Sequence, residues 1–149
     1  MDIGKINGAR EIAFVGRHKP CVYFLVGDGG EVLYIGKSQS VGVRIGQHMA
    51  SKRFERLFII ECKNDEEAFK KESRLILKYQ PPMNHRVDAW RLGLLTREKI
   101  LRVLKERGCR KTWREVDALL WVYKKNPIEF HSVKYYKPDV VDFIIEKVL

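Results

Sequence analysis

The chain has 149 residues, enough for one ordinary domain or a small domain with an appendage, and its 45% hydrophobic content argues against disorder. With 29 Lys and Arg against 19 Asp and Glu it carries a formal charge of +10, which favours a polyanionic partner, nucleic acid before an anionic membrane surface. No apolar run approaches the ~18 residues of a membrane span, and the three cysteines are too scattered for a zinc site or a disulfide framework.

Residues 1–20 are polar and contain glycine, and we interpret them as an N-terminal arm that could add one edge strand. They lack the apolar block of a secretory signal peptide. Together with the scattered cysteines, this predicts a cytoplasmic protein, or a nuclear one if the source is eukaryotic.

Two β-prone runs, Cys21–Val26 and Glu31–Gly36, flank the turn-forming residues Gly27–Gly30 and predict a hairpin. If these four residues form the loop, Tyr23 lies directly opposite Tyr34. Directly opposed residues of an antiparallel pair project to the same face, with Cβ atoms about 5 Å apart. The sequence therefore predicts that the two tyrosine hydroxyls converge on one spot.

A helix, a strand and a longer helix are expected after the hairpin. The first helix covers residues 41–50 and places Arg44 and His48, four positions apart, on one face. The strand covers residues 56–62. The second helix covers residues 64–80, because it begins with a capping-box pattern and a double proline ends it.

Glu72 is a charged residue on the apolar stripe of the second helix, four positions from both Ala68 and Ile76. A carboxylate on such a face must be paired or must bind a metal. The spacing leaves both alternatives open, and an ion pair with Arg44 is at least as favoured as a metal ligand. Asn84, which follows the double proline, is by itself an ordinary turn residue.

Taken together, these positions resemble the GIY-YIG nuclease family. The two signature triplets stand here as Cys21-Val22-Tyr23 and Tyr34-Ile35-Gly36, followed by Arg44 and by the segment Glu72–Asn84. The resemblance covers about residues 21–84. Cys21-Val22 replaces the Gly-Ile of the family, but only the tyrosine of that triplet carries chemistry. His48 makes the chain more similar to homing and restriction members than to repair nucleases with a tyrosine there.

The resemblance implies an α+β fold, with a small central antiparallel three-stranded sheet flanked by helices in a nuclease domain of residues 21–86. It also implies hydrolysis of a DNA phosphodiester bond with one divalent metal, Mg²⁺ or Mn²⁺. The expected partner is double-stranded or branched DNA, with no membrane and no small-molecule cofactor. One such site cuts one strand, so cutting both strands would need a dimer or two successive events.

The resemblance also assigns catalytic roles. Glu72 would hold the metal, which as a hard cation takes oxygen ligands and keeps several waters. Tyr23 and Tyr34 would position and deprotonate the attacking water, and His48 could relay the proton. Tyrosine has a reference pKa near 10, so nearby cations would have to lower it for this role at neutral pH.

Three further residues would support this chemistry. Arg44 and Lys37 would supply the cations and clamp the phosphate. Asn84 would orient Glu72 or a water at the metal.

Residues 87–149 lie outside the resemblance and are predicted to be a mainly helical C-terminal region. Helices are expected at residues 97–107 and 113–125, a short strand at 130–136, and a last helix that begins after Pro138. The two capped helices suggest a helix-turn-helix-like pair, and the segment after them is faintly similar to the wing of winged DNA-binding modules.

Four basic residues cluster at the predicted turn between those two helices and could hold a phosphate backbone: Arg107, Arg110, Lys111 and Arg114. The helix from Trp113 would then enter the groove. The alternative is a helical extension that covers the nuclease sheet and takes no part in DNA recognition.

The leading hypothesis is a metal-dependent DNA endonuclease, either of the homing or phage type or structure-specific. The alternative is a catalytically silent nucleic-acid-binding protein on the same fold. The complete polar set favours the enzyme, because a degenerate site should have lost Glu72 or Arg44.

Overall fold

A computed structural model describes residues 1–12 and 19–148 of the chain. Backbone contacts divide the chain into two compact units, Met1–Val87 and Asp88–Leu149. Residues 13–18, which belong to the predicted arm, lie outside the described residues. No helix in the described part of the chain combines the length and the apolarity that crossing a membrane requires.

The first unit is built on an antiparallel sheet with the strand order β1-β4-β2-β3. Its strands are β1 (Arg10–Glu11), β2 (Cys21–Val26), β3 (Val32–Ser38) and β4 (Arg56–Glu61). All six residues of β2 are buried, because this strand is central and both of its faces are covered. The expected antiparallel sheet flanked by helices is confirmed, and β1 is an edge strand that the N-terminal arm adds to the three predicted strands.

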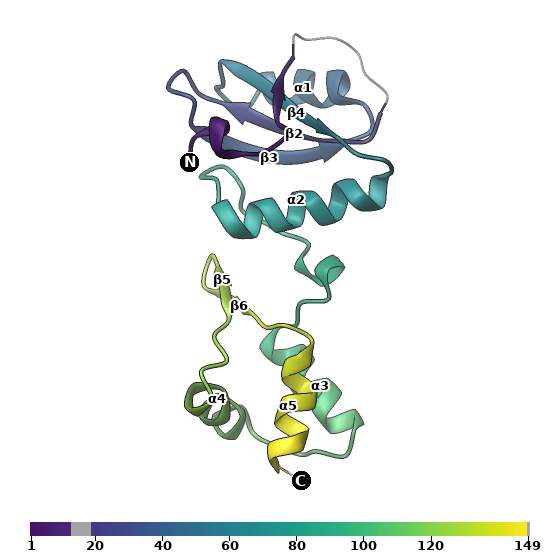
Figure 1. The fold of residues 1–149 in the computed structure, drawn as a ribbon, viewed down its shortest axis with the longest axis vertical. Helices are drawn as coiled ribbons and strands as arrows, with labels where there is room; N and C mark the ends of the chain where they lie inside the picture. Colours follow the sequence, from purple (N-terminus) through teal and green to yellow (C-terminus); the bar gives the residue numbers. More distant parts are fainter. Residues whose placement is uncertain (13–18, 149) are drawn as a thin grey trace. The chain divides into compact units, whose positions relative to one another are not determined.

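Two helices, α1 (Val41–Met49) and α2 (Asp65–Tyr79), cover opposite faces of this sheet (Figure 1). Alternation along β2 sends Cys21, Tyr23 and Leu25 to one face, where they form a cluster with Val41 and Ile45 of α1. At the start of α2, Asn64 Oδ1 accepts a hydrogen bond of 2.8 Å from the backbone N–H of Glu67. Gln80 ends α2 in a left-handed conformation, directly before the double proline.

The hairpin differs from the predicted register. Tyr23 pairs with Gly36 rather than with Tyr34, and Tyr34 pairs with Leu25. The loop is one residue longer than predicted, because Val26 pairs with Val32, and a bulge at Leu33 adds a second one-residue shift. Since side chains alternate with a period of two, the two shifts together leave both tyrosines on the same face.

Gly36 provides the space that the Tyr23 ring occupies. A Cβ atom at Gly36 would lie 2.4 Å from both Cζ and the hydroxyl oxygen of Tyr23. The ring therefore lies directly over the backbone of β3, where any larger residue would displace it.

The N-terminal residues pack against the hairpin. The backbone N–H of Val32 donates to the carbonyl of Met1 at 2.8 Å, and that of Ile3 donates to the carbonyl of Gly30 at 2.9 Å. Ile3, in the short 3-10 helix η1 (Ile3–Lys5), and Ile6 are buried. The described start of the predicted arm is thus part of the first unit.

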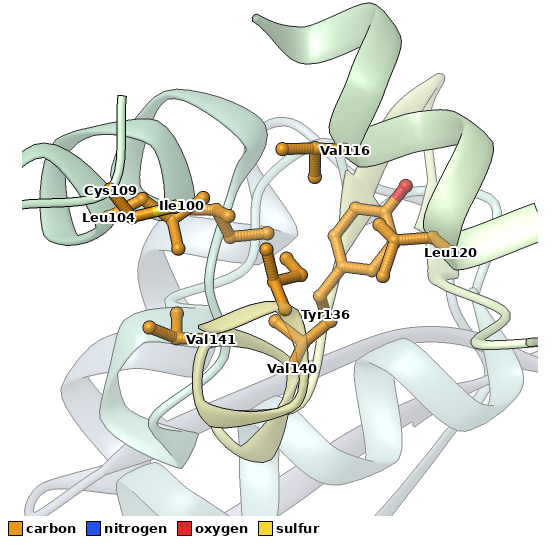
Figure 2. Close-up of a cluster of buried hydrophobic side chains, with 9 residues drawn as sticks. Ile100, Leu104, Cys109, Val116, Leu120, Tyr136, Val140 and Val141 are labelled. Carbon is orange, nitrogen blue, oxygen red and sulfur yellow. The ribbon is translucent and has the colours of Figure 1, made fainter. Parts of the chain in front are cut away.

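In its described residues, 88–148, the second unit consists of three α-helices, a short 3-10 helix and one hairpin. In chain order these are η2 (Ala89–Leu92), α3 (Arg97–Glu106), α4 (Trp113–Val122), β5 (Ile128–Phe130), β6 (Val133–Tyr135) and α5 (Asp139–Val148). Figure 2 shows the buried cluster they enclose, in which the Tyr136 ring lies among Val116, Leu120 and Val140. The helical C-terminal region is confirmed.

Two details of this unit correct the prediction. The single strand expected at residues 130–136 is a hairpin, because His131 and Ser132 both adopt positive φ and form a tight turn. α4 ends at Val122 instead of residue 125, because Lys124 has a φ of 52° and the N–H of Lys125 returns to the carbonyl of Leu120.

Gly36 and Gly46 give a matched pair of stability tests. We expect Gly36→Ala to lower the free energy of unfolding by about 1–3 kcal/mol, because the added methyl group clashes with the buried Tyr23 ring. Gly46→Ala should instead raise it by up to about 1 kcal/mol, since Gly46 lies within α1 and its added Cβ would meet nothing within 4 Å. Chemical denaturation of the two variants measures both changes, and effects of the same sign would contradict this account.

Candidate active site

Three aromatic side chains of the predicted site meet on the face of the sheet that α1 covers. The ring centroids of Tyr23 and Tyr34 lie 6.1 Å apart, and those of Tyr34 and His48 lie 4.9 Å apart. Neighbouring strands supply the tyrosines and the last turn of α1 supplies His48. The diagonal register of the hairpin brings the two tyrosines together as effectively as direct opposition would.

A buried hydrogen bond joins two of these residues. The Tyr23 hydroxyl lies 2.7 Å from Nε2 of His48, and the two residues are 1% and 8% exposed. Burial lowers the pKa of His48, and the positive charges of Lys52 and Arg44 lower it further. The imidazole is therefore neutral at pH 7 and can exchange a proton with Tyr23.

Both tyrosines are harder to ionise than a tyrosine in water. Burial raises the pKa of Tyr23, the neighbouring Tyr34 adds to this effect, and the charge of Arg44 opposes it. Burial also raises the pKa of Tyr34, followed by the negative charge of Glu72, while Arg44 again acts in the opposite direction. At neutral pH the two hydroxyls keep their protons and can pass protons along a chain of hydrogen bonds.

Arg44 lies on the exposed side of α1, one turn before His48. Its Nη1 donates a hydrogen bond of 2.9 Å to Oε1 of Gln47. Because its charge acts on Tyr23, Tyr34 and His48 alike, Arg44 supplies the positive potential of this site. An exposed guanidinium in this position is available to an anionic ligand.

Glu72 reaches the same site from α2, where it is half-buried. Its charge raises the pKa of both tyrosines, which places the carboxylate within electrostatic range of their hydroxyls. In the described ranges, no group of three or more His, Cys, Asp or Glu side chains is arranged to hold a metal. One carboxylate within electrostatic range of hydroxyl groups still fits a hard cation such as Mg²⁺, which uses few protein ligands and keeps several waters.

Lys37 is held by α2. Its Nζ lies 2.8 Å from Oδ1 and 3.0 Å from Oδ2 of Asp65, and 3.5 Å from the centre of the Phe69 ring. These two partners of Lys37 were missed, because Asp65 lies 28 positions further along the chain and no local pattern connects it to Lys37. The contact fixes the start of α2 to β3.

Asn84 binds the backbone of β3 at the residue after Tyr34. Its Oδ1 accepts from the N–H of Ile35 at 2.9 Å, and its Nδ2 donates to the Ile35 carbonyl at 2.8 Å. The N–H of Met83 also donates to the carbonyl of Leu33 at 3.0 Å. Because β3 is an edge strand, the segment after α2 thus satisfies backbone groups that would otherwise lack a strand partner.

The basic cluster predicted in the C-terminal region belongs to the second unit. Arg107 forms an ion pair with Asp142, and Lys111 forms one of 3.2 Å with Glu115. Arg110 and Arg114 are exposed. The DNA-binding role of this cluster stays a prediction.

Comparison with known proteins found matches within the first unit. Residues 19–86 match the family model of the GIY-YIG catalytic domain. The UvrABC system protein C of Mycoplasma pneumoniae is 32% identical in an alignment of 77 residues that covers 45% of this chain and 13% of that protein. The match thus spans 13% of the length of this curated relative.

Two solved structures are similar over the same part of the chain. The N-terminal GIY-YIG endonuclease domain of Thermotoga maritima UvrC, described as bound to its catalytic magnesium, is 28% identical with a TM-score of 0.42, covering 48% of this chain and 89% of that one. A point mutant of that domain is 27% identical with a TM-score of 0.43, covering 49% and 90%.

The subdivision suggested by His48, towards homing and restriction members, stays a prediction. The signature triplets and the family model locate the same segment in the first unit. Residues 19–86 of this chain therefore belong to the GIY-YIG catalytic domain family.

Proposed function

We propose that the chain is a DNA endonuclease that depends on a divalent metal and hydrolyses phosphodiester bonds. The observation that carries this proposal is the Tyr23–His48 hydrogen bond beside Tyr34, within the range of one carboxylate, Glu72, and one exposed guanidinium, Arg44. Hydrolysis of a phosphodiester needs an acceptor for the proton of water, positive charge next to the phosphate oxygens and a stabilised leaving oxygen. The site offers groups for each need.

The proton acceptor is His48. Tyr34 is half-buried and faces the attacking water, whereas Tyr23 is buried behind it and is hydrogen-bonded to the imidazole. The proton of the water passes to Tyr34 as Tyr34 gives its own to Tyr23, and Tyr23 in turn protonates Nε2 of His48. Raised tyrosine pKa values suit this relay, because neither phenol has to remain ionised.

Arg44 binds the scissile phosphate and stabilises the charge that develops on its oxygens. Lys37 stays paired with Asp65 and holds the strand that carries Tyr34 in place. Glu72 would hold Mg²⁺ or Mn²⁺, which supplies Lewis-acid stabilisation of the leaving oxygen when bound. Asn84 acts on the site through β3, by fixing the Ile35 backbone next to Tyr34.

Removal of the Glu72 carboxylate tests the enzyme assignment. We expect Glu72→Ala to reduce nicking of supercoiled plasmid in Mg²⁺ by roughly 10²-fold or more, since a metal contributes several kcal/mol to the transition state. Glu66→Ala is the matched control, because Glu66 lies on the same helix and pairs with Lys70 at its exposed side. Gel electrophoresis of nicked and linear products gives the rates.

The same assay with branched DNA in place of plasmid distinguishes a structure-specific enzyme from one of the homing or phage type. Cleavage of neither DNA by the wild-type chain, or equal rates for wild type and Glu72→Ala, would refute the nuclease proposal and favour a silent DNA-binding protein.

The pH dependence of cleavage tests the role of His48. Protonation removes its ability to accept a proton, so the rate should fall as the pH drops through the lowered His48 pKa, below about 6.5. His48→Phe should cost roughly 10²–10⁴-fold in rate.

Lys52 offers a sharper form of this pH test, because its charge helps to lower the His48 pKa. Lys52→Gln should move the acid limb of the profile to higher pH, whereas Arg53→Gln, at the exposed neighbouring position, should leave it in place. An acid limb that stays unchanged in Lys52→Gln would show that another group controls the profile.

A further inference from the structure

The outward face of α4 carries exposed charged and aromatic side chains that take no part in the core of the second unit. Val116 and Leu120 turn inward to the buried cluster. The opposite stripe, spaced by three and four residues, presents Arg114, Asp117 and Trp121, all exposed. Trp121 is 82% exposed, which exceeds every other large hydrophobic residue among those the structure describes. Val122 and Tyr123, which follow Trp121, are 61% and 47% exposed, so this end of α4 presents a cluster of exposed apolar side chains of the kind that marks interaction surfaces.

Basic groups lie at both ends of the same helix. Arg110 and Lys111 precede its first turn, and Arg110, like Arg114, has no ion-pair partner within the described residues. Beyond its last turn, a pocket of about 300 Å³ is lined by Lys124, Lys125 and Lys137, together with Asn126, Tyr136, Asp139 and Val140. Nζ of Lys125 lies 3.9 Å from the Asp139 carboxylate, so the charge of Lys125 is partly balanced inside the pocket. Lys124 and Lys137 are therefore the two lysines of this pocket that we expect to contact phosphates.

The spacing of these basic ends fits a duplex. α4 has ten residues and is therefore about 15 Å long. The major groove of B-DNA is about 12 Å wide and is bordered by the phosphates of both strands. A helix of this length that lies across the groove brings its two basic ends to opposite phosphate backbones and its central stripe to the base edges.

The rest of the unit holds α4 in a helix-turn-helix arrangement. Figure 1 shows α4 nearly end-on, whereas α3 and α5 lie lengthwise in the same view, so α4 crosses both. The hairpin β5–β6 follows, and Leu95 before α3 pairs with Tyr136 through two backbone hydrogen bonds of 2.9 and 2.8 Å. Because Tyr136 is also part of the buried cluster, the hairpin is fixed relative to α4.

We propose that the second unit is a winged helix-turn-helix module and that α4 reads base pairs in the major groove of double-stranded DNA. Arg114 suits the acceptor pair of guanine, Asp117 suits the amino group of cytosine, and Trp121 suits the methyl group of thymine. Arg110, Lys111, Lys124 and Lys137 bind phosphates and carry the part of the affinity that does not depend on sequence. This binding is independent of the cleavage proposed for the first unit.

The test uses the full chain in EDTA, so that binding is measured without cleavage. A pool of 30-base-pair duplexes with a randomised centre is incubated with the wild-type chain, and the bound duplexes are sequenced. The wild type should enrich a common motif. Fluorescence anisotropy on an enriched duplex and on a shuffled one then separates the contributions of the side chains.

Two double variants should fail in different ways. Arg114→Ala with Trp121→Ala should lose about 10-fold or more in affinity for the enriched duplex and little for the shuffled one. Arg110→Ala with Lys124→Ala should lose affinity for both duplexes and reduce the slope of log K against log salt by about 2, roughly 0.9 per lost phosphate contact.

Arg102→Ala is the matched control, since Arg102 is exposed on α3 and its loss removes the same charge. Thermal denaturation checks that the exposed substitutions leave the fold intact. Two outcomes would overturn the proposal. One is the absence of an enriched motif. The other is that the double variant, Arg114→Ala with Trp121→Ala, binds the enriched duplex as tightly as the Arg102→Ala control.

Equal binding to an RNA duplex of the enriched sequence would also overturn the proposal, because the deep, narrow major groove of A-form RNA does not admit a helix. A chain that selects DNA in EDTA but nicks no plasmid in Mg²⁺ would refute the nuclease alone.

Discussion

The contact between the Tyr23 ring and the backbone of Gly36 is the constraint on which the first unit depends. β2 is the central strand, so the ring cannot turn to solvent and must lie over its neighbour β3. The missing Cβ of Gly36 provides that space, and the ring then directs its hydroxyl to His48, 2.7 Å away. Tyr23 therefore belongs both to the apolar cluster under α1 and to the candidate active site.

Local signals in the sequence were sufficient for most helices and strands but not for the hairpin register. Asn64, Thr96 and Thr112 cap helices that begin where the sequence predicts them, because capping depends only on residues three positions away. The register depends on loop length and on the bulge at Leu33, which no local pattern marks. Although the predicted register was wrong, the prediction that the two tyrosines share one face was right, because two one-residue shifts restore the original face.

The residues of the candidate site were predictable because the sequence resembles a known family. Several of their hydrogen-bond and ion-pair partners were not predictable. The pairing of Lys37 with Asp65 and the double hydrogen bond of Asn84 to Ile35 join positions that are 28 and 49 residues apart. Neither residue type demands these partners, since a lysine and an asparagine each have many alternatives in water. The positive potential from Arg44 was expected, but the raised pKa values of both tyrosines, which suit the proposed relay, follow from burial that only the fold reveals.

In the first unit the same residues contribute to the core and to the candidate site, whereas in the second unit the core and the outward face of α4 use different residues. In the first unit, polar groups of the candidate site are buried in the core, so that a change at Tyr23 or His48 alters both the packing and the hydrogen bond between them. In the second unit, the core and the outward face of α4 share no residue, because Val116 and Leu120 point inward while Arg114 and Trp121 are exposed. The outward face can therefore change in sequence without loss of the fold, whereas the geometry of the candidate active site is tied to the sheet that carries it.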